Sequence, residues 1–258
     1  MKLYLACNAC LHEKITNTNF LREDWSNIFT EVEYTDSGYY SFTCQNGHQN
    51  FVMLQEQDFE ILFQIGANAI LDGYYREAIS SFTSSLERFY EFCVRVLCLK
   101  HGVDNEKLEQ CRKFYKNSSD RQISSFLFLY LAEFNSLPFN LKKDEDWRHF
   151  RNEVIHKGKI PTKQEALQYG NYVRRFILQT ILKLKVNHSN EIQSLVMEHL
   201  KNKNEHNVSQ GWASVMCTGT IISLANGMIE KNLEKSLEEE LDGLQKMRQL
   251  SSYHCRPK

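Results

Sequence analysis

The stretch AISSFTSSLERFYEFCVRV, residues 78–96, decides the class of fold. Its apolar side chains recur at spacings of three and four, at Ile79, Phe82, Leu86, Phe89, Cys93 and Val96. This spacing places them on one face, so the stretch predicts an α-helix of about 25 residues that packs against a core. Gly102 follows and offers a place for this helix to end.

Three further stretches with helical spacing follow along the chain, at 123–134, 144–156 and 166–184. Thr162 precedes the last of them, and Glu165 stands three residues after Thr162, which is the spacing of a capping box. Helices joined by short connections are typical of bundles. The sequence therefore predicts a helical bundle over residues 55–187.

The tail, residues 188–258, carries further helical patterns and predicts a helical C-terminal extension. Its part 230–248 is charged and amphipathic, which is typical of a helix that packs against a partner. Residues 212–229 are apolar, but they contain Ser, Thr and Asn and are short for a membrane span of about 20 residues. We expect a buried helix there and no membrane contact, with a membrane-associated protein as the weaker alternative.

The composition is that of an ordinary globular protein. Its 258 residues leave room for a small module beside a main domain, and its net charge of −1 excludes a global basic field. No secretory signal is visible at the N-terminus. The five cysteines at 93, 98, 111, 217 and 255 are scattered through helical patterns, which indicates a reducing compartment and predicts a cytoplasmic protein.

Residues 1–54 predict a separate β-rich module. Residues 39–43 and 51–54 favour β-strands and flank a polar turn that contains Asn46 and Gly47, which is typical of a hairpin. Such a small module has little apolar core of its own, so it needs a covalent cross-link or a bound metal ion to stabilise it. Residues 11–36 are polar and show only weak periodicity.

Two short pairs of metal-ligating residues lie in this module. Cys7 and Cys10 form a Cys-x-x-Cys pair, and Cys44 and His48 form a Cys-x-x-x-His pair on the hairpin turn. Together they predict a closed site with three sulfur ligands and one nitrogen ligand that holds a structural Zn²⁺ ion. His12 is an alternative fourth ligand, and ordinary reduced cysteines are the alternative to a metal site. The pattern resembles zinc ribbons, which bind nucleic acid or proteins.

The predicted helix at 144–156 carries the residues with the clearest chemical potential. His156 stands near its C-terminus, where the helix dipole favours the protonated imidazole, and Arg151 and Asn152 lie about a turn earlier. A histidine that exchanges its proton near neutral pH, beside a fixed cation, suits the cleavage of a phosphodiester. The arginine would stabilise the added negative charge at phosphorus, and no metal is required.

This pattern, Arg151-Asn-Glu-Val-Ile-His156, resembles the motif of the HEPN superfamily, and the resemblance covers residues 58–186. It implies a HEPN-like helical bundle whose active members are metal-independent endoribonucleases found in toxin and antiviral defence systems. It also implies a homodimer in which two Arg-His sets face one cleft, with RNA as substrate and an antidote or sensor protein as a further partner. The residues that it marks as catalytic are Arg151, Asn152 and His156.

Helix geometry qualifies this assignment. Asn152 and His156 are four residues apart and share a face, whereas Arg151 points to the side of His156. Arg148 shares that face and is an alternative functional arginine, and a partner subunit is an alternative source. Arg151 could instead form an ion pair with an acidic neighbour such as Glu87, in which case His156 merely caps the helix.

Basic residues interleaved with aromatic ones fall between the first two long helices, at Arg112, Lys113, Phe114, Tyr115, Lys116 and Arg121. Such a mixture suits single-stranded RNA through phosphate contacts and base stacking, although a solvated surface explains most of these residues equally well. The leading hypothesis is therefore an endoribonuclease. The alternative is a non-catalytic dimeric scaffold whose zinc ribbon binds nucleic acid or a partner protein.

Overall fold

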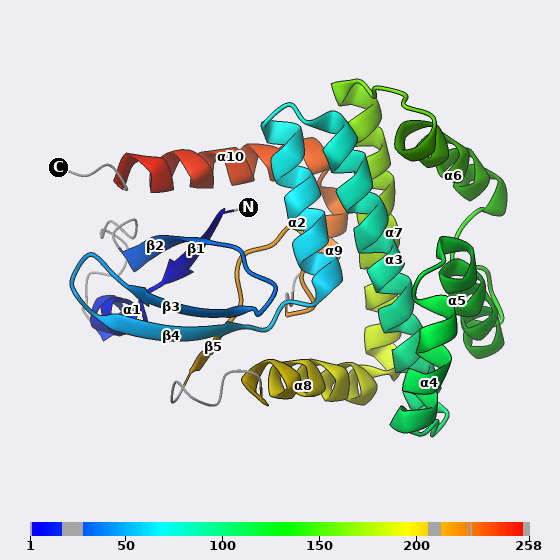
Figure 1. The fold of residues 1–258 in the computed structure, drawn as a ribbon, viewed down its shortest axis with the longest axis horizontal. Helices are drawn as coiled ribbons and strands as arrows, with labels where there is room; N and C mark the ends of the chain where they lie inside the picture. Colours follow the sequence, from blue (N-terminus) through cyan, green and yellow to red (C-terminus); the bar gives the residue numbers. More distant parts are fainter. Residues whose placement is uncertain (1, 17–27, 206–212, 226, 228, 255–258) are drawn as a thin grey trace. The chain divides into compact units, whose positions relative to one another are not determined.

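The computed structural model describes residues 2–16, 28–205, 213–225, 227 and 229–254. Within them the chain is mainly helical with a small N-terminal sheet region, as predicted (Figure 1). The chain forms two compact units: the first contains Met1–Glu56, Met197–Gly219 and Leu241–Lys258, and the second contains Gln57–Val196 and Thr220–Glu240. The tail from residue 188 onward is thus shared between the two units.

Short β-strands build the first unit. Two antiparallel pairs form, β1 with β2 and β3 with β4, and a short fifth strand lies parallel to β4. The strands are β1 (Lys2–Ala6), β2 (Phe29–Glu33), β3 (Tyr39–Thr43), β4 (Gln49–Leu54) and β5 (Ser214–Met216). The predicted hairpin is confirmed: Gly47 occupies the turn between β3 and β4 with a positive φ of 81°, which glycine adopts without a steric penalty.

A small apolar core supports these strands, and it consists of Leu3, Leu5, Tyr40, Val52 and Leu54. A helix that the sequence did not reveal, α1 (Asn8–Thr16), follows β1. Its periodicity was too weak to predict because it has nine residues and buries only Cys10. The unit is therefore held by few apolar contacts, which fits the expectation that a module of this size needs a further constraint.

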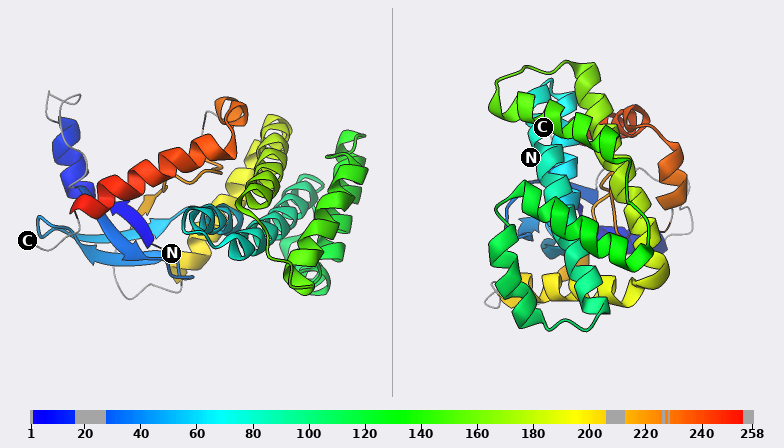
Figure 2. Two further views of the ribbon diagram at one scale, coloured as in Figure 1. Left: turned by 90° about the horizontal axis from the view of Figure 1, so that it is seen from above. Right: turned by 90° about the vertical axis from the view of Figure 1, so that its right-hand side faces the viewer.

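The second unit is a helical bundle organised around α3 (Figures 1 and 2). Its main helices are α2 (Asp58–Leu71), α3 (Tyr75–Lys100), α4 (Asn105–Tyr115), α5 (Ser119–Phe134), α6 (Leu141–His156) and α7 (Lys163–Asn187). The helices predicted from residues 78–96, 123–134, 144–156 and 166–184 are α3, α5, α6 and α7. Helix α4 occupies the region of the basic and aromatic residues between the first two.

Aromatic side chains fill the centre of this bundle. Phe89 of α3 lies 5.1 Å from Phe59 of α2 and 6.1 Å from Phe176 of α7, ring centre to ring centre. Two glycines let the neighbouring helices approach α3, because a Cβ at Gly66 or at Gly170 would come within 2.6 Å of the Phe82 ring. The apolar face predicted from residues 78–96 is thus the core of the second unit.

The predicted helix ends are also present. Thr162 caps α7: its hydroxyl accepts the Glu165 N–H at 3.2 Å, and the Glu165 carboxylate accepts the Thr162 N–H at 2.8 Å. Helix α3 ends at Lys100, and Gly102 follows with a φ of 71°. These local signals therefore fixed both boundaries correctly.

The prediction of a buried helix at residues 212–229 is wrong for the part that the structure describes. Residues 214–216 form β5, and the residues from 217 to 225 are not helical. The backbone N–H groups of Thr218, Ile221 and Leu224 donate instead to the side chains of Glu56, Gln64 and Glu60. These acceptors are all buried and need hydrogen-bond donors. An extended backbone supplies its N–H groups to them, whereas the N–H groups of a helix would be used within the helix.

The remaining helices are α8 (Ser189–Glu205), α9 (Ile229–Glu234) and α10 (Leu237–His254). The amphipathic helix expected at 230–248 is therefore two helices. Ser236 separates them and begins α10: its hydroxyl accepts the Glu239 N–H at 3.2 Å, and the Glu239 carboxylate accepts the Ser236 N–H at 2.6 Å. Among the described residues, no helix is both long and apolar enough to cross a membrane.

Candidate functional site

The first candidate site gathers both predicted ligand pairs of the first unit. Cys7 directly follows β1, Cys10 lies in the first turn of α1, Cys44 follows β3 and His48 precedes β4. The three cysteines are buried and His48 is half-buried. One ligand atom from each residue lies within 4.8 Å of every other, so the cluster could hold a metal ion.

The distances within this cluster are those of ligands around one centre. Nδ1 of His48 lies 3.7 Å from the Cys7 sulfur, 3.3 Å from the Cys10 sulfur and 3.6 Å from the Cys44 sulfur. The sulfurs of Cys10 and Cys44 are 3.8 Å apart. These four separations, from 3.3 to 3.8 Å, are compatible with four ligands at the corners of a tetrahedron. The alternative ligand His12 is exposed and is not part of the cluster.

The two turns that carry the ligands are held by backbone hydrogen bonds. The Cys7 N–H donates to the Ile28 carbonyl and the Cys44 N–H donates to the His48 carbonyl, at 2.8 and 3.0 Å. The second turn is closed by Gly47, whose N–H donates to the Cys44 carbonyl at 2.9 Å. The ligands therefore sit on backbone that is already shaped to present them.

The thiols of the first pair have different acidities. Burial raises the pKa of Cys7, but hydrogen bonds from the Cys10 backbone and the Asn50 side chain outweigh it and lower this pKa to about 6. Burial and the neighbouring Cys7 raise the pKa of Cys10 to about 11, although Asn46 donates to its sulfur. Of these two thiols, Cys7 forms a thiolate at neutral pH and Cys10 does not without a cation, so full deprotonation of this pair calls for a bound cation.

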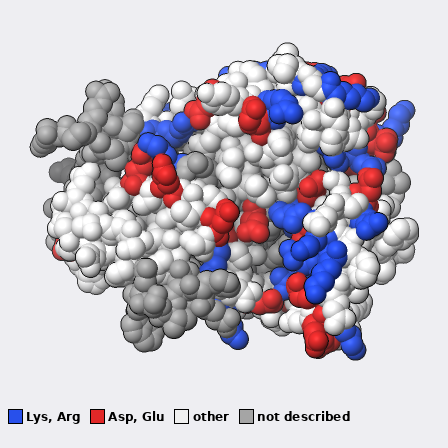
Figure 3. Space-filling model, in the orientation of Figure 1, with Lys and Arg blue, Asp and Glu red and all other residues white. Residues whose placement is uncertain are grey.

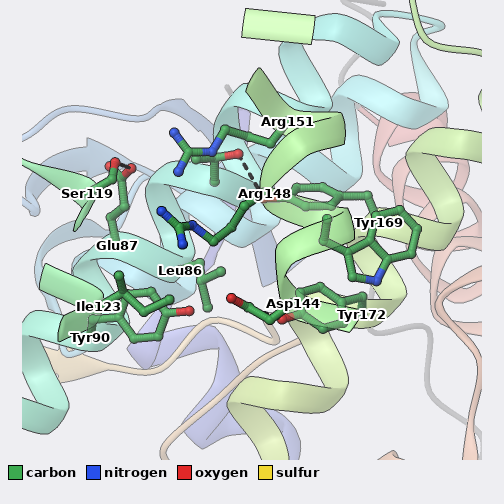
Figure 4. Close-up of a pocket in the computed structure, with 12 residues that line it drawn as sticks. Leu86, Glu87, Tyr90, Ser119, Ile123, Asp144, Arg148, Arg151, Tyr169 and Tyr172 are labelled. Carbon is green, nitrogen blue, oxygen red and sulfur yellow. Dashed lines mark hydrogen bonds between the residues drawn. The ribbon is translucent and has the colours of Figure 1, made fainter. Parts of the chain in front are cut away.

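The second candidate site is a pocket in the second unit, between α3, α5, α6 and α7 (Figure 4). It is lined by Thr83, Leu86, Glu87, Tyr90, Ser119, Ile123, Asp144, Trp147, Arg148, Arg151, Tyr169 and Tyr172. Its cavity volume is about 30 Å³. That space holds a group of a few heavy atoms.

Two arginines of α6 enter this pocket, and their surroundings differ. Arg148 is paired, since its guanidinium lies 2.5 Å from Asp120 and 3.3 Å from Glu145. Arg151 forms no hydrogen bond or ion pair with any residue in the described part of the chain, and Figure 4 shows its guanidinium beside that of Arg148. Glu87, the expected partner of Arg151, instead accepts a hydrogen bond from the Ser119 hydroxyl.

Aromatic and acidic side chains form the inner wall of the pocket. Trp147 stacks on Tyr172 with ring centres 5.6 Å apart, and the Tyr172 hydroxyl donates to Asp144 at 2.5 Å. Burial raises the pKa of Asp144, which the hydrogen bond from Tyr172 and the charge of Arg148 partly counteract. The carboxyl groups of Glu87 and Asp144 thus already have donors, whereas Arg151 contributes only its charge, which also lowers the pKa of Asp144.

The other two predicted catalytic residues lie outside the pocket. Asn152 is half-buried and His156 is exposed at the last position of α6. Five residues separate Arg151 from His156, so the two side chains leave the helix axis in directions about 140° apart. The structure therefore brings Arg151 to the pocket with Arg148, and it does not bring His156 to the same place.

The basic residues between α3 and α5 are partly engaged in structural contacts. Arg112 forms ion pairs with Glu91 and Glu109, at 3.2 and 3.7 Å, and Arg121 donates to the Phe114 carbonyl at 2.8 Å. Phe114 is 76% exposed, unlike the buried Tyr115. Figure 3 shows cationic and anionic side chains interspersed over this face of the molecule, which agrees with the small net charge.

The sequence did not reveal that side chains of α3 and α5 form a pocket with α6. Glu87 was expected only as a possible ion-pair partner of Arg151, and both residues line the pocket. Glu87 and Ser119 lie 32 residues apart on different helices, and no sequence spacing connects them. Comparisons with protein-family models, with curated proteins and with solved structures found no match to this chain, so the HEPN resemblance stays a prediction.

Proposed function

We propose that this protein is a metal-independent endoribonuclease of the HEPN type that works as a homodimer. The observation that carries the proposal is the guanidinium of Arg151, which lines a small pocket and has no hydrogen-bonding or ionic partner among the described residues. It lies on the same helix as the exposed imidazole of His156. Removing a charge from water without pairing it is costly, so the half-buried Arg151 favours an anionic ligand there. The RNA backbone supplies such an anion at every nucleotide.

In the proposed reaction the 2′-oxygen of a ribose attacks the adjacent phosphorus, and the bond from phosphorus to the 5′-oxygen of the next nucleotide breaks. One imidazole takes the proton of the 2′-hydroxyl, and a second gives a proton to the leaving 5′-oxygen. A dimer supplies both imidazoles from its two copies of His156. Arg151 stabilises the additional negative charge on the phosphate, and Asn152 orients the phosphate or His156.

The position of His156 suits this scheme. His156 ends α6 and is exposed, so a substrate can reach its imidazole. Arg148 is the weaker choice for the functional arginine because Asp120 and Glu145 already neutralise it. We therefore assign the phosphate contact to Arg151.

We further propose that the metal of the first unit is Zn²⁺ with a structural role. A tetrahedral Zn²⁺ ion, with Zn–S bonds of about 2.3 Å and Zn–N bonds of about 2.0 Å, sets S···S at about 3.8 Å and S···N at about 3.5 Å. The cluster has 3.8 Å between sulfurs and 3.3 to 3.7 Å from sulfur to nitrogen. Its four protein ligands leave no position for a substrate, and the module would bind RNA or a protein partner.

The test uses a fluorescently labelled tRNA or single-stranded RNA and four purified proteins: wild type, Arg151→Ala, His156→Ala and Arg175→Ala. Arg175 is an exposed arginine of α7 that does not line the pocket. We expect the first two variants to cleave about 10²–10⁴-fold more slowly and Arg175→Ala to match wild type. Equal rates for all four proteins would reject the endonuclease assignment.

A second candidate function is a non-catalytic dimeric scaffold that binds RNA or a protein. It is favoured by one observation, the separation of His156 from the pocket that contains Arg151. This function predicts that Arg151→Ala weakens RNA binding, measured by fluorescence anisotropy, while His156→Ala binds normally and no RNA is cut. The same set of variants therefore distinguishes the two functions.

A further inference from the structure

The two halves of the proposed metal site come from distant parts of the chain and need something to align them. Cys7 and Cys10 belong to the turn between β1 and α1, and Cys44 and His48 belong to the β3–β4 hairpin. The backbone hydrogen bonds within each turn shape that turn alone. The buried side chain of Asn50 forms hydrogen bonds with the backbone of both halves.

Asn50 is the second residue of β4 and is 5% exposed. Its Oδ1 accepts the N–H of Asn8, the residue that directly follows the ligand Cys7, at 3.1 Å. Its Nδ2 donates to the carbonyl of His48, a ligand of the second pair, at 3.0 Å.

These contacts use both kinds of group in the amide. An asparagine side chain has one carbonyl oxygen and one NH₂ group, and here the oxygen accepts from Asn8 while the nitrogen donates to His48. An acceptor and a donor at a fixed separation are needed at once, and a side-chain amide supplies both.

We propose that Asn50 is a positioning residue for the metal site, which holds the first ligand pair in register with the second. The inference rests on the proposed zinc site and adds a residue that is not itself a ligand. Groups in the shell around metal ligands fix ligand orientation, and their loss lowers metal affinity by roughly 10–100-fold. Asn50 fits that role because it bonds the backbone of the ligand His48 and the backbone of Asn8, which directly follows the ligand Cys7.

Two nearby asparagines provide matched comparisons. Asn46 donates to the Cys10 sulfur at 3.3 Å, but it is exposed and touches one ligand only. The side chain of Asn8 donates to the Ser214 hydroxyl, away from the ligands, and is exposed as well. The proposed order of importance for metal binding is therefore Asn50 first, Asn46 second and the side chain of Asn8 last.

The experiment measures the zinc affinity of the full chain by competition with a chromophoric chelator, for wild type, Asn50→Asp, Asn50→Ala, Asn46→Ala and Asn8→Ala. Asn50→Asp keeps the volume and the acceptor for Asn8 but removes both donors. We expect both Asn50 variants to bind zinc roughly 10–100-fold more weakly. Asn46→Ala should lose less, and Asn8→Ala should equal wild type.

Cobalt supplies a readout that a purely structural role would not move. The absorption bands of Co²⁺ bound in place of zinc report the geometry of its ligands, and we expect Asn50→Asp to shift them while Asn8→Ala leaves them unchanged. A third measurement is the free energy of unfolding of the metal-free proteins in urea. If Asn50 positions the ligands, Asn50→Asp and wild type should have similar free energies of unfolding without metal.

The inference is overturned if both Asn50 variants bind zinc with wild-type affinity and show unshifted cobalt bands, whatever their stability. It is also overturned if Asn8→Ala weakens binding as much as Asn50→Asp does. A wild-type protein that binds no zinc would remove the proposed metal and this inference together. That result would leave the RNA cleavage assay unaffected, so the failures are distinguishable.

Discussion

The metal cluster and the Arg-His motif show how differently sequence spacing translates into spatial proximity. Cys10 and Cys44 are 34 residues apart, yet their sulfurs lie 3.8 Å from each other because two strand turns meet. Arg151 and His156 are five residues apart on one helix, and only Arg151 lines the pocket. Turns bring their ligands to one point, whereas a regular helix separates side chains by a fixed angle.

The largest expected effect concerns the first of these regions. Cys44→Ser removes one of four proposed ligands, and the metal that links β1, α1 and the hairpin is then lost. Structural zinc contributes on the order of 10 kcal/mol to the folding of small modules, while the apolar core here is small. We therefore expect the strands β1 to β4 and helix α1 to lose hydrogen-exchange protection and the zinc content to fall to the background.

The matched control is Cys217→Ser. Cys217 is an exposed thiol of the first unit and lies outside the cluster. It should retain full zinc content and the protection of the wild-type strands. Loss of zinc in this control, or full zinc content in Cys44→Ser, would contradict the assignment of Cys44 as a metal ligand.

The next largest effect separates a structural arginine from the one proposed to act on RNA. The side chain of Arg174 is fully buried on α7, where it donates to the Lys235 carbonyl at 2.9 Å and to Glu240 at 3.1 Å. Arg174→Ala leaves Glu240 and the carbonyls without their donor, so we expect a loss of about 3–5 kcal/mol in the free energy of unfolding. Urea denaturation measures it.

Arg151→Ala is the counterpart in that measurement. Arg151 has no hydrogen-bonding or ionic partner among the described residues, so its removal should change stability by about 0.5 kcal/mol or less. A loss of several kcal/mol would show that Arg151 is a structural residue. The contrast between the two arginines would then disappear.

The smallest effect tests the cap of α7. Thr162→Ala removes a side-chain acceptor at the start of the helix and should lower the free energy of unfolding by about 1 kcal/mol. The N–H of Thr162 and the ammonium of Lys159 hold the pKa of Glu165 below its usual value of 4.5. Because the folded-state pKa is depressed, the contribution of Glu165 is complete above pH 4.5 and is lost as the pH falls through the folded value.

Glu165→Gln should therefore reduce stability at pH 7 and make little difference in acid, below the folded pKa of Glu165. Thermal unfolding of wild type and variant at several pH values measures this directly. A difference between the two proteins that stays constant down to the lowest pH would contradict the role of the carboxylate charge.

Local patterns were enough to predict much of this molecule. The apolar spacing of residues 78–96 predicted α3, and the capping box at Thr162 predicted the start of α7, because both depend on neighbours within a few residues. The metal ligands were predictable because Cys-x-x-Cys and Cys-x-x-x-His each mark a turn. Gly47 then fixes the shape of the second turn.

Features that depend on distant residues were not predictable. The composition of the stretch after β5 predicts a buried helix. Its backbone is extended instead because it donates hydrogen bonds to the buried side chains of Glu60 and Gln64, which are distant in the sequence. The pocket likewise combines side chains from four helices. The pairing of Arg148 with Asp120, which leaves Arg151 as the available cation, could be read only from the structure.

The proposed function is tested most directly by the chemical ends of the cut RNA. Zinc-loaded wild-type protein is incubated with a defined RNA without added magnesium, and the products are analysed by mass spectrometry. Attack by the ribose 2′-oxygen predicts a 2′,3′-cyclic phosphate on one fragment and a 5′-hydroxyl on the other, absent with His156→Ala. Fragments with 3′-hydroxyl and 5′-phosphate ends, or the same fragments from His156→Ala, would contradict the assignment.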